Sequence, residues 1–292
     1  SESYSPRYAD IMVDAKTGDV LHESAPDGLR HPASLTKIMT LYLLFEKLEA
    51  GKVRLDSQME VSAEAASQAP TKLGLRPGQT LMVEDAIKGL VTKSANDAAV
   101  VLAERLADGS EKKFAEKMTA KGKALGLRQT TFRNASGLPD EGHVTTARDL
   151  ALLSRAVIRD FPQYYPYFST EAFEFRGMRY PNQNRFLRTY YGGDGLKTGF
   201  VNASGNNLAA SAIRSGRRLV AVVLGGNSQA WTREHASRLL DVAYARIDPS
   251  LVVVKASPGG QPVPAVLVPA LPATASFTEP AGSASIAAAP TA

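Results

Sequence analysis

A nearly unbroken apolar run at residues 31–48, "HPASLTKIMTLYLLFEKL", limits the folds open to this chain more than any other stretch. Between Ile38 and Phe45 the residues are apolar on almost every side of a helix, so this helix has no face suited to water. A proline at position 32 and a serine near the boundary are typical of a helix start. The sequence therefore predicts a buried helix at the centre of a domain core.

Two polar side chains stand at the front of this run. Ser34 and Lys37 are one helical turn apart, so they would share a face of the helix. The positive end of the helix dipole lies at this turn, and a desolvated ammonium is unfavourable unless it is paired or neutralised. The placement suggests a serine made nucleophilic by a lysine in a cleft. The alternative is a helix start whose polar groups are satisfied locally.

The patterns along the rest of the chain predict strands at its two ends and helices between them. Residues 8–23 alternate apolar and polar around a turn, which predicts a β-hairpin. Amphipathic helical patterns follow, strand patterns return from residue 171, and a final helix is predicted at about 231–247. This order predicts one mixed sheet with a helical lobe inserted at about residues 60–165.

Composition divides the chain into two parts. Residues 1–249 have the composition of a globular domain, and the chain as a whole is 44% hydrophobic and 22% charged. Residues 250–292 contain only two charged residues, Lys255 and Glu279, and proline recurs there too often for a helix. We expect a linker or disordered tail in this part, with a strand only at "LVVVKA".

Charge, cysteine and histidine content exclude several classes of site. The net charge of +5 comes without a dense Lys/Arg run, so we expect no nucleic-acid or lipid-binding patch. The absence of cysteine excludes disulfides, thiol catalysis and thiolate metal sites. The four histidines, His22, His31, His143 and His235, lack metal-binding spacing, so we expect no metal and no organic cofactor. No apolar stretch reaches the length of a transmembrane helix.

Three short motifs that together mark penicillin-recognising serine enzymes, S-x-x-K, S-x-N and K-T-G, each occur twice. One set has ordinary explanations. Ser110–Lys113 opens a charged amphipathic helix, Ser204–Asn206 lies in a polar turn, and Lys16–Gly18 forms the tip of the predicted hairpin. We therefore expect capping and turn roles for these three copies.

The other copies are Ser34–Lys37, Ser94–Asn96 and Lys197–Gly199. The first opens the buried helix, the second connects two apolar helices, and the third begins a strand. Each has a structural explanation when it is taken alone. Their order and their places on a helix, a connection and a strand jointly favour an active site.

The segments around these motifs resemble the low-molecular-mass penicillin-binding proteins, serine-type D-alanyl-D-alanine carboxypeptidases of the bacterial periplasm. The segments are "HPASLTKIMTLYLLFE", "LGLRPGQTLMVEDAIKGLVTKSANDAAVVLAE", "FRNASGLPD", "TTARDLALLSRAV" and "DGLKTGFVNASGNNLAASA", and the resemblance covers about residues 8–247. It implies an α/β fold of the α+β type, the serine β-lactamase and penicillin-binding transpeptidase-like fold. In that fold a five-stranded antiparallel sheet flanked by helices lies beside a mostly helical lobe, and the catalytic cleft lies between them.

The resemblance also implies catalytic roles. Ser34 would be the nucleophile and Lys37 the base that takes its proton. Ser94 would relay a proton to the leaving amine, and Asn96 would hydrogen-bond the substrate backbone. The backbone N–H groups of Ser34 and Phe200 would form the oxyanion hole.

The strand side would bind substrate through Lys197, Thr198, Gly199, Phe200 and Arg218. Arg218 would hold the substrate's terminal carboxylate together with Lys197 and Thr198. Arg214 and Arg217 are close in sequence, and strand alternation alone does not decide which of the three arginines faces the cleft.

The implied substrate is a peptidoglycan stem peptide ending in D-Ala-D-Ala, with β-lactam antibiotics as covalent inhibitors and no nucleic-acid partner. The implied location is the periplasm, and we expect that a signal peptide has been removed from this chain. Residues 250–292 show no basic amphipathic stripe, so we do not expect them to anchor the protein to a membrane.

Three alternatives stay open at this point. A D,D-endopeptidase or transpeptidase would use the same residues on cross-linked peptides. A class A β-lactamase would need a glutamate that activates water, and we find no convincing one between residues 134 and 190. A non-catalytic peptidoglycan-binding module would not need all three motifs intact.

Overall fold

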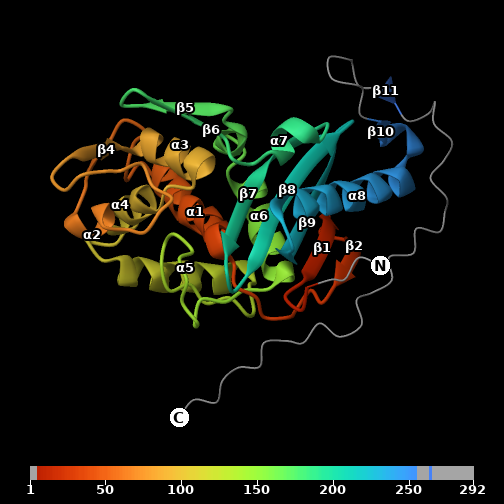
Figure 1. Ribbon diagram of the computed structural model, residues 1–292, viewed down its shortest axis with the longest axis horizontal. Helices are drawn as coiled ribbons and strands as arrows, with labels where there is room; N and C mark the ends of the chain where they lie inside the picture. The colour runs from red at the N-terminus through yellow and green to blue at the C-terminus, as the bar shows by residue number, and fades with distance from the viewer. Residues whose placement is uncertain (1–4, 255–262, 265–292) are drawn as a thin grey trace, which may run out of the picture.

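The structure, a computed structural model, describes residues 5–254 and 263–264. Its main element is a five-stranded antiparallel sheet with the strand order β2-β1-β9-β8-β7 (Figure 1). The strands of this sheet are β1 (Ala9–Asp14), β2 (Val20–Ser24), β7 (Gly193–Val201), β8 (Gly205–Arg214) and β9 (Arg217–Gly226). The predicted β-hairpin is confirmed by β1 and β2.

The sheet joins the two ends of the sequence. Strand β1 pairs with β9, so that Ala9 lies opposite Leu224. Strand β7, which carries the K-T-G motif, pairs only with β8 and forms one edge of the sheet. The other side of β7 has no strand partner in this sheet. The residues just before the buried helix, Ala33–Leu35, pack there.

Helices and turns fill the rest of the described chain. The α-helices are α1 (Thr36–Glu49), α2 (Ala63–Ala66), α3 (Val83–Lys93), α4 (Asn96–Leu106), α5 (Glu111–Leu125), α6 (Ala147–Asp160), α7 (Phe186–Thr189) and α8 (Gln229–Ile247). The 3₁₀ turns are η1 (Ala33–Leu35), η2 (Tyr165–Ser169) and η3 (Pro249–Leu251). Most of the predicted helices are confirmed, with boundaries shifted by a few residues.

Helices α6 and α8 cover opposite faces of the sheet (Figure 1). Side chains of successive strand residues point to opposite faces, and β9 follows this rule. Val220, Val222 and Leu224 belong to the hydrophobic cluster beside α1 and α6. Leu219 and Val223 belong to the cluster beside α8. Both faces of the sheet are covered, so the side chains on both sides of β9 are buried. The sequence of β9 is therefore a continuous apolar run.

Helix α1 is the centre of the larger cluster. Ile38, Leu41 and Phe45 are fully buried, and the helix packs against α4, α5 and α6. The prediction of a buried helix is confirmed. The α-helix itself begins at Thr36, because the preceding residues from Ala33 form the 3₁₀ turn η1.

Helices α2 to α5 pack with α1 beside the sheet, in the place expected for the inserted lobe (Figure 1). Two small antiparallel pairs accompany them: β3 (Gln58–Glu60) with β4 (Thr80–Met82), and β5 (Ala172–Phe175) with β6 (Met178–Pro181). The fold is therefore the α+β arrangement implied by the resemblance. The lobe bounds of 60–165 stay a prediction.

The described chain continues past residue 249. Leu251 is 8% exposed and belongs to the cluster beside α8, and its carbonyl accepts a hydrogen bond of 2.8 Å from Arg214. Two short strands follow, β10 (Val253–Val254) and β11 (Val263–Pro264). The domain boundary at residue 249 stays a prediction, but the packed chain extends at least two residues beyond it. The remainder of the tail lies outside the described residues.

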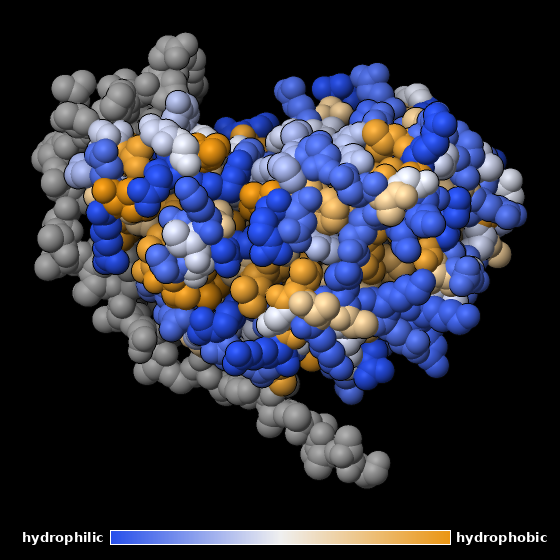
Figure 2. Space-filling view, turned by 180° about the vertical axis from the view of Figure 1, so that it is seen from behind, coloured by the Kyte–Doolittle hydropathy of each residue, from blue (hydrophilic) through white to orange (hydrophobic). Residues whose placement is uncertain are grey.

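The surface is polar in most places. Figure 2 shows hydrophilic side chains over much of one face, with hydrophobic ones in several separate groups. Within residues 5–254 and 263–264, no helix combines the length and the hydropathy that crossing a bilayer requires.

Candidate active site

Three segments far apart in the sequence meet at the open edge of β7. They are the η1 turn with the first turn of α1, the connection between α3 and α4, and β7 itself. The first brings Ser34 and Lys37, the second Ser94 and Asn96, and the third the K-T-G motif. The three motif copies singled out from the sequence are thus brought together.

The Lys37 amine lies where four polar groups meet. Its Nζ is 3.0 Å from the Oγ atoms of both Ser34 and Ser94, 2.8 Å from Asn96 Oδ1 and 2.9 Å from the carbonyl oxygen of Ser136. The side chain is fully buried, with 0% of its surface exposed. All the hydrogen-bonding capacity of this nitrogen is therefore used inside the protein.

The four partners can accommodate a neutral amine. A carbonyl oxygen and a carboxamide oxygen can only accept, so Ser136 and Asn96 take two N–H bonds. A neutral amine has two N–H bonds and one lone pair, and the lone pair is then left for a hydroxyl proton. The Asn96 orientation is fixed because its Nδ2 donates to the Ala69 carbonyl at 2.9 Å. Lys37 is therefore placed to accept the proton of Ser34.

The electrostatics agree with this arrangement. Burial, and after it the nearby positive charge of Lys197, lower the pKa of Lys37 well below its usual range, while the negative charge of Asp97 opposes them. Burial also lowers the pKa of Lys197 to about 7. A lysine that loses its proton near neutral pH can act as a general base.

Two residues of the site have left-handed backbone conformations that non-glycine residues rarely adopt. Ser94 ends α3 with a φ of 58°, and Ala33, directly before Ser34, has a φ of 50°. Such conformations cost energy and cluster at functional sites. Here they turn the chain sharply at the points where the two serines are presented.

A loop behind α1, at residues 135–137, completes the lysine site, and no role for it was predicted from the sequence. Thr40 donates a hydrogen bond of 2.7 Å to the Ala135 carbonyl, next to the Ser136 carbonyl that Lys37 uses. Gly137 has a φ of 92°, and a Cβ there would lie 1.8 Å from the Ala33 carbonyl oxygen. In the sequence these residues belong to "FRNASGLPD", one of the segments that carry the family resemblance.

Strand β7 passes close to the nucleophile. A Cβ on Gly199 would lie 2.7 Å from the backbone nitrogen of Ser34, so only glycine allows this approach. Lys197 is buried and donates to the Thr198 carbonyl at 2.9 Å. Phe200 is 53% exposed. The K-T-G strand thus lines the cleft with small, polar and exposed groups.

Arg218 does not reach the cleft. Its guanidinium binds both oxygens of Asp194, at 2.7 and 2.8 Å, and donates to Ser211 at 2.9 Å. In the sheet Arg218 lies opposite Ile213, near the far end of the β8–β9 hairpin. The assignment of Arg218 to carboxylate binding is therefore wrong, because strand register carries it away from the K-T-G motif.

The two arginines close to Arg218 in the sequence, Arg214 and Arg217, also lie away from the cleft. Arg217 lies opposite Arg214 at the turn of the β8–β9 hairpin. The Arg214 guanidinium stacks on Tyr190, with its carbon 4.3 Å from the ring centroid, and donates to the Leu251 carbonyl. None of the three arginines weighed from the sequence faces the cleft.

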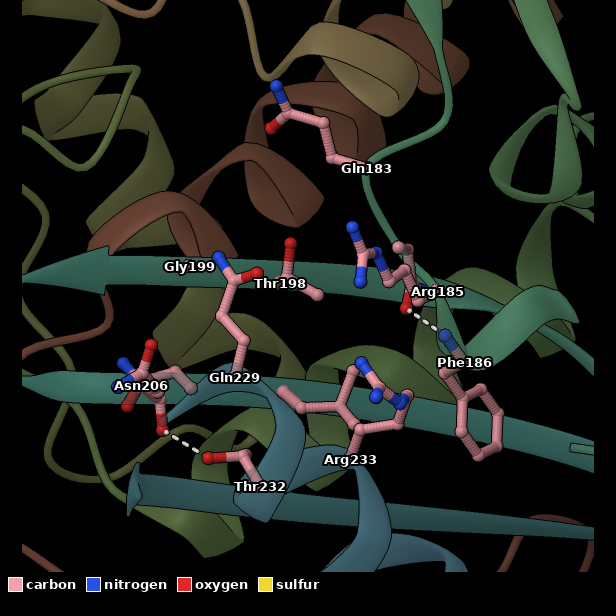
Figure 3. A pocket seen from close by; sticks show the side chains of 12 residues that line it. Gln183, Arg185, Phe186, Thr198, Gly199, Asn206, Gln229, Thr232 and Arg233 are labelled. Carbon is pink, nitrogen blue, oxygen red and sulfur yellow. Dashed lines mark hydrogen bonds between the residues drawn. The ribbon is translucent and has the colours of Figure 1, made fainter. Parts of the chain in front are cut away.

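Two other arginines lie beside Thr198. Arg185, before α7, and Arg233, in the second turn of α8, line one pocket together with Thr198, Gly199 and Gln229. In Figure 3 Arg185 and Gln229 reach toward Thr198 from opposite sides, and Arg233 projects from α8. These residues were missed because the fold, and no spacing in the sequence, brings the start of α7 and the start of α8 to one pocket with Thr198.

The alternative copies of the motifs have the ordinary roles expected of them. Ser110 caps α5 by accepting a hydrogen bond of 3.1 Å from the Lys113 backbone N–H. Ser204 closes the β7–β8 turn, where its hydroxyl donates to the Gly205 carbonyl at 2.7 Å. The Lys16 motif lies in the β1–β2 turn.

Comparison with known proteins agrees with this geometry. The profile of the peptidase S11 family, described as D-alanyl-D-alanine carboxypeptidase, matches residues 7–228. The match covers well over half of the chain. The chain belongs to this family.

Individual relatives of the family are similar over most of the chain. It is 38% identical over 237 residues to the D-alanyl-D-alanine carboxypeptidase DacC of Escherichia coli, which corresponds to 79% of this chain and 59% of DacC. For DacF of Bacillus subtilis the identity is 33% over 243 residues, or 82% of this chain and 62% of DacF. The chain therefore spans about three fifths of the length of these relatives.

Solved structures of the family share the fold. Penicillin-binding protein 5 of Haemophilus influenzae superposes with a TM-score of 0.78 at 32% identity, over 81% of this chain and 70% of that one. Penicillin-binding protein D2 of Listeria monocytogenes, solved in an ampicillin-bound form, gives a TM-score of 0.71 at 30% identity. That match covers 84% of this chain and 99% of the other.

Proposed function

We propose that this protein is a serine D-alanyl-D-alanine carboxypeptidase that removes the terminal D-Ala from peptidoglycan stem peptides. The observation that carries the proposal is the buried Lys37 amine, which lies within hydrogen-bond distance of Ser34, Ser94 and Asn96. Membership of the family supports the same reaction. We further propose a periplasmic location, where such peptides are found.

In the acylation step Ser34 Oγ attacks the carbonyl of the penultimate D-Ala while its proton passes to Lys37 Nζ. The carbonyl oxygen becomes an oxyanion, and the backbone N–H groups of Ser34 and Phe200 stabilise it. The C–N bond to the terminal D-Ala then breaks, and its nitrogen receives a proton through the hydroxyl of Ser94. The close approach of Gly199 to Ser34 supports this location for the oxyanion hole.

Deacylation repeats these steps with water. The Lys37 amine takes a proton from the water, which attacks the ester carbon, and Ser34 recovers its hydroxyl proton when the C–O bond breaks. A β-lactam would acylate Ser34 in the same way, since it also presents an amide beside a carboxylate, and the strain of its ring makes that amide more reactive. Asn96 would hold the peptide backbone during both steps.

The terminal carboxylate needs cationic and hydroxyl donors on the leaving-group side of Ser34. Thr198, Arg185 and Arg233 line one pocket there. The charge of Lys197 adds to the positive potential on this side of the cleft. We therefore assign carboxylate binding to Thr198 and Arg233, in place of Arg218.

Two measurements test the proposal. Mass spectrometry after incubation with penicillin should find the adduct on Ser34, absent from Ser34→Ala and unchanged in the matched control Ser110→Ala. In the second measurement, the unmodified chain should release free D-Ala from a peptide ending in D-Ala-D-Ala. An adduct on another residue would refute the assignment of the nucleophile. Cleavage of cross-linked peptides alone would identify an endopeptidase. Rapid hydrolysis of penicillin would identify a β-lactamase.

A further inference from the structure

A buried carboxylate that the mechanism above does not use lies directly after Asn96. Asp97 is 0% exposed and belongs to the first turn of α4. It forms no ion pair with any residue that the structure describes. A buried charge without an ion-pair partner is costly unless hydrogen bonds compensate for it, so its contacts should show what it does.

All the hydrogen bonds of this carboxylate are to backbone N–H groups. Its oxygens accept from Leu73, Gly74 and Leu75 at 3.0, 2.9 and 3.0 Å, and from Ala98 at 2.9 Å. Only an acceptor with two oxygens and several lone pairs can take four N–H bonds, so an amide could not replace it. Asp97 therefore fixes residues 73–75 against the start of α4.

The segment just before residue 73 in turn holds the connection between α3 and α4. The Ala69 carbonyl accepts from Asn96 Nδ2 at 2.9 Å, and the Thr71 carbonyl accepts from the Asn96 backbone N–H at 2.8 Å. The Thr71 hydroxyl donates to the carbonyls of Lys93 and Ser94, at 2.9 and 3.0 Å. Both motif residues of this connection thus depend on residues 69–71.

We infer that Asp97 is a positioning residue: by anchoring residues 73–75 it holds residues 69–71 in place, and through them it fixes Ser94 and Asn96 around Lys37. The inference rests on the function proposed above. The last link is the Asn96 carboxamide, because its Nδ2 bond to Ala69 is what directs its Oδ1 toward the lysine.

The charge of Asp97 has a second effect on the same lysine. The groups that act on Lys37 are Lys197 from β7, which lowers its pKa, and Asp97 from α4, which raises it against the larger effect of burial. Removing the negative charge should lower the pKa of Lys37 further. The amine would then be neutral at lower pH, so the acidic limb of the acylation rate should shift to lower pH.

The chain contains a matched control. Asp149, at the start of α6, is also buried and accepts from the backbone N–H groups of Arg128 and Gln129 at 3.2 and 2.9 Å, and from Thr130 Oγ1 at 2.6 Å. It has the same kind of anchoring role but no hydrogen bond to the site or to the loop that holds it. A purely structural effect should be common to both aspartates.

The experiment measures thermal midpoints and the rate of acylation by penicillin between about pH 5 and pH 9 in the unmodified chain, Asp97→Asn and Asp149→Asn. We expect both variants to melt at lower temperature. Only Asp97→Asn should acylate more slowly, by about a hundredfold, the loss expected from a small misplacement of reacting groups. Only in this variant should the acidic limb shift to lower pH.

A wild-type rate and pH profile in folded Asp97→Asn, or equal losses in the two variants, would overturn the inference. No acylation of the unmodified chain would overturn the proposed function as well, so the two failures are distinguishable. If Asp97→Asn does not fold, the variant Thr71→Val tests the inference instead. Thr71 is exposed, so the substitution should be tolerated, and its hydroxyl joins residues 69–71 to Lys93 and Ser94. Slower acylation by Thr71→Val with an unshifted pH profile supports the inference, and an unchanged rate refutes it.

Discussion

The two sides of the cleft differ in how their polar groups are satisfied. On the helical wall, formed by Ser34, Lys37, Ser94 and Asn96, the Lys37 amine is bonded to the other three side chains. On the strand wall, formed by Thr198, Gly199, Phe200, Arg185, Gln229 and Arg233, the polar side chains face an open pocket. Within the described chain, no hydrogen bond or ion pair engages the Arg185 or Arg233 guanidinium.

The difference matches two separate tasks. A proton transfer depends on a fixed distance between donor and acceptor, so the groups that make it are buried and held from several directions. Recognition of a carboxylate needs groups whose bonds are still free when the ligand arrives. In the proposed mechanism the helical wall is thus built before the substrate binds, and the strand wall is completed by the substrate.

The largest effect should come from the centre of the helical wall. Lys37→Arg keeps the positive charge but cannot lose a proton, so acylation by penicillin should fall by at least about a thousandfold, within the range for loss of a catalytic base. Lys197→Arg keeps a cation on the strand wall and should retain part of the activity. Stopped-flow acylation measurements compare the two variants. Acylation of Lys37→Arg at a near wild-type rate would show that the amine is not the base.

The strand wall should respond in substrate binding more than in the chemical step. Arg233→Ala should raise KM for a D-Ala-D-Ala peptide roughly tenfold, the cost of about one charge-assisted hydrogen bond, with a smaller change in kcat. Arg218→Ala is the control, because its partner is Asp194 and it lies away from the cleft. It should lower the thermal midpoint and leave KM unchanged. A higher KM for Arg218→Ala, with an unchanged KM for Arg233→Ala, would show that Arg218 binds the carboxylate.

The buried Lys197 of the strand wall should reduce stability in a pH-dependent way. Burial lowers the pKa of Lys197 to about 7, below the value of about 10.4 expected in the unfolded chain. Between these values the unfolded chain binds more protons, so the unfolding free energy rises with pH. Lys197→Met should therefore raise the thermal midpoint at pH 7 by at least about 2 °C, and the gain should shrink toward pH 10. A lower midpoint at pH 7 would contradict this.

The smallest effect is expected far from both walls. Truncation after residue 249 removes Leu251 and its bond to Arg214, so the thermal midpoint should fall by a few degrees, about 1 kcal/mol of stability. The rate of D-Ala release should stay within about twofold, as for most changes outside an active site. Truncation after residue 254 should change neither quantity. A large loss of activity in either case would show that the C-terminal segment supports the cleft.

The sequence was most informative where chemistry and local pattern coincide. Helix α1 could be predicted because its apolar residues surround the whole axis, and Ser34 and Lys37 because one helical turn sets their spacing. The capping role expected of Ser110 is confirmed, while the choice of the other copies as the catalytic ones stays a prediction. These inferences depend only on neighbours within about one turn of helix.

Features that depend on strand register and on loops could not be predicted in the same way. Arg218 was misplaced because a turn and a strand register decide how far along the sheet it lies. Arg233 was missed because helix packing brings α8 to β7. The Ser136 carbonyl and the Asp97 anchor belong to backbone hydrogen bonds, which any residue type at the loop positions could form. Their chemistry leaves little trace in the residue pattern.

Because β1 pairs with β9, the sheet can be completed only late in the synthesis of the chain. A chain made from its N-terminus has Ser34 and Lys37 long before β7, and β1 cannot take its place until Leu224 is available to pair with Ala9. The helices between can pack on one another earlier, because all of α1 to α6 precede β7 in the chain. The base and the nucleophile would then exist without the strand that supplies Phe200. In the proposed mechanism the unfinished chain would carry its reactive pair without an oxyanion hole, and would become an enzyme only when almost the whole domain has been made.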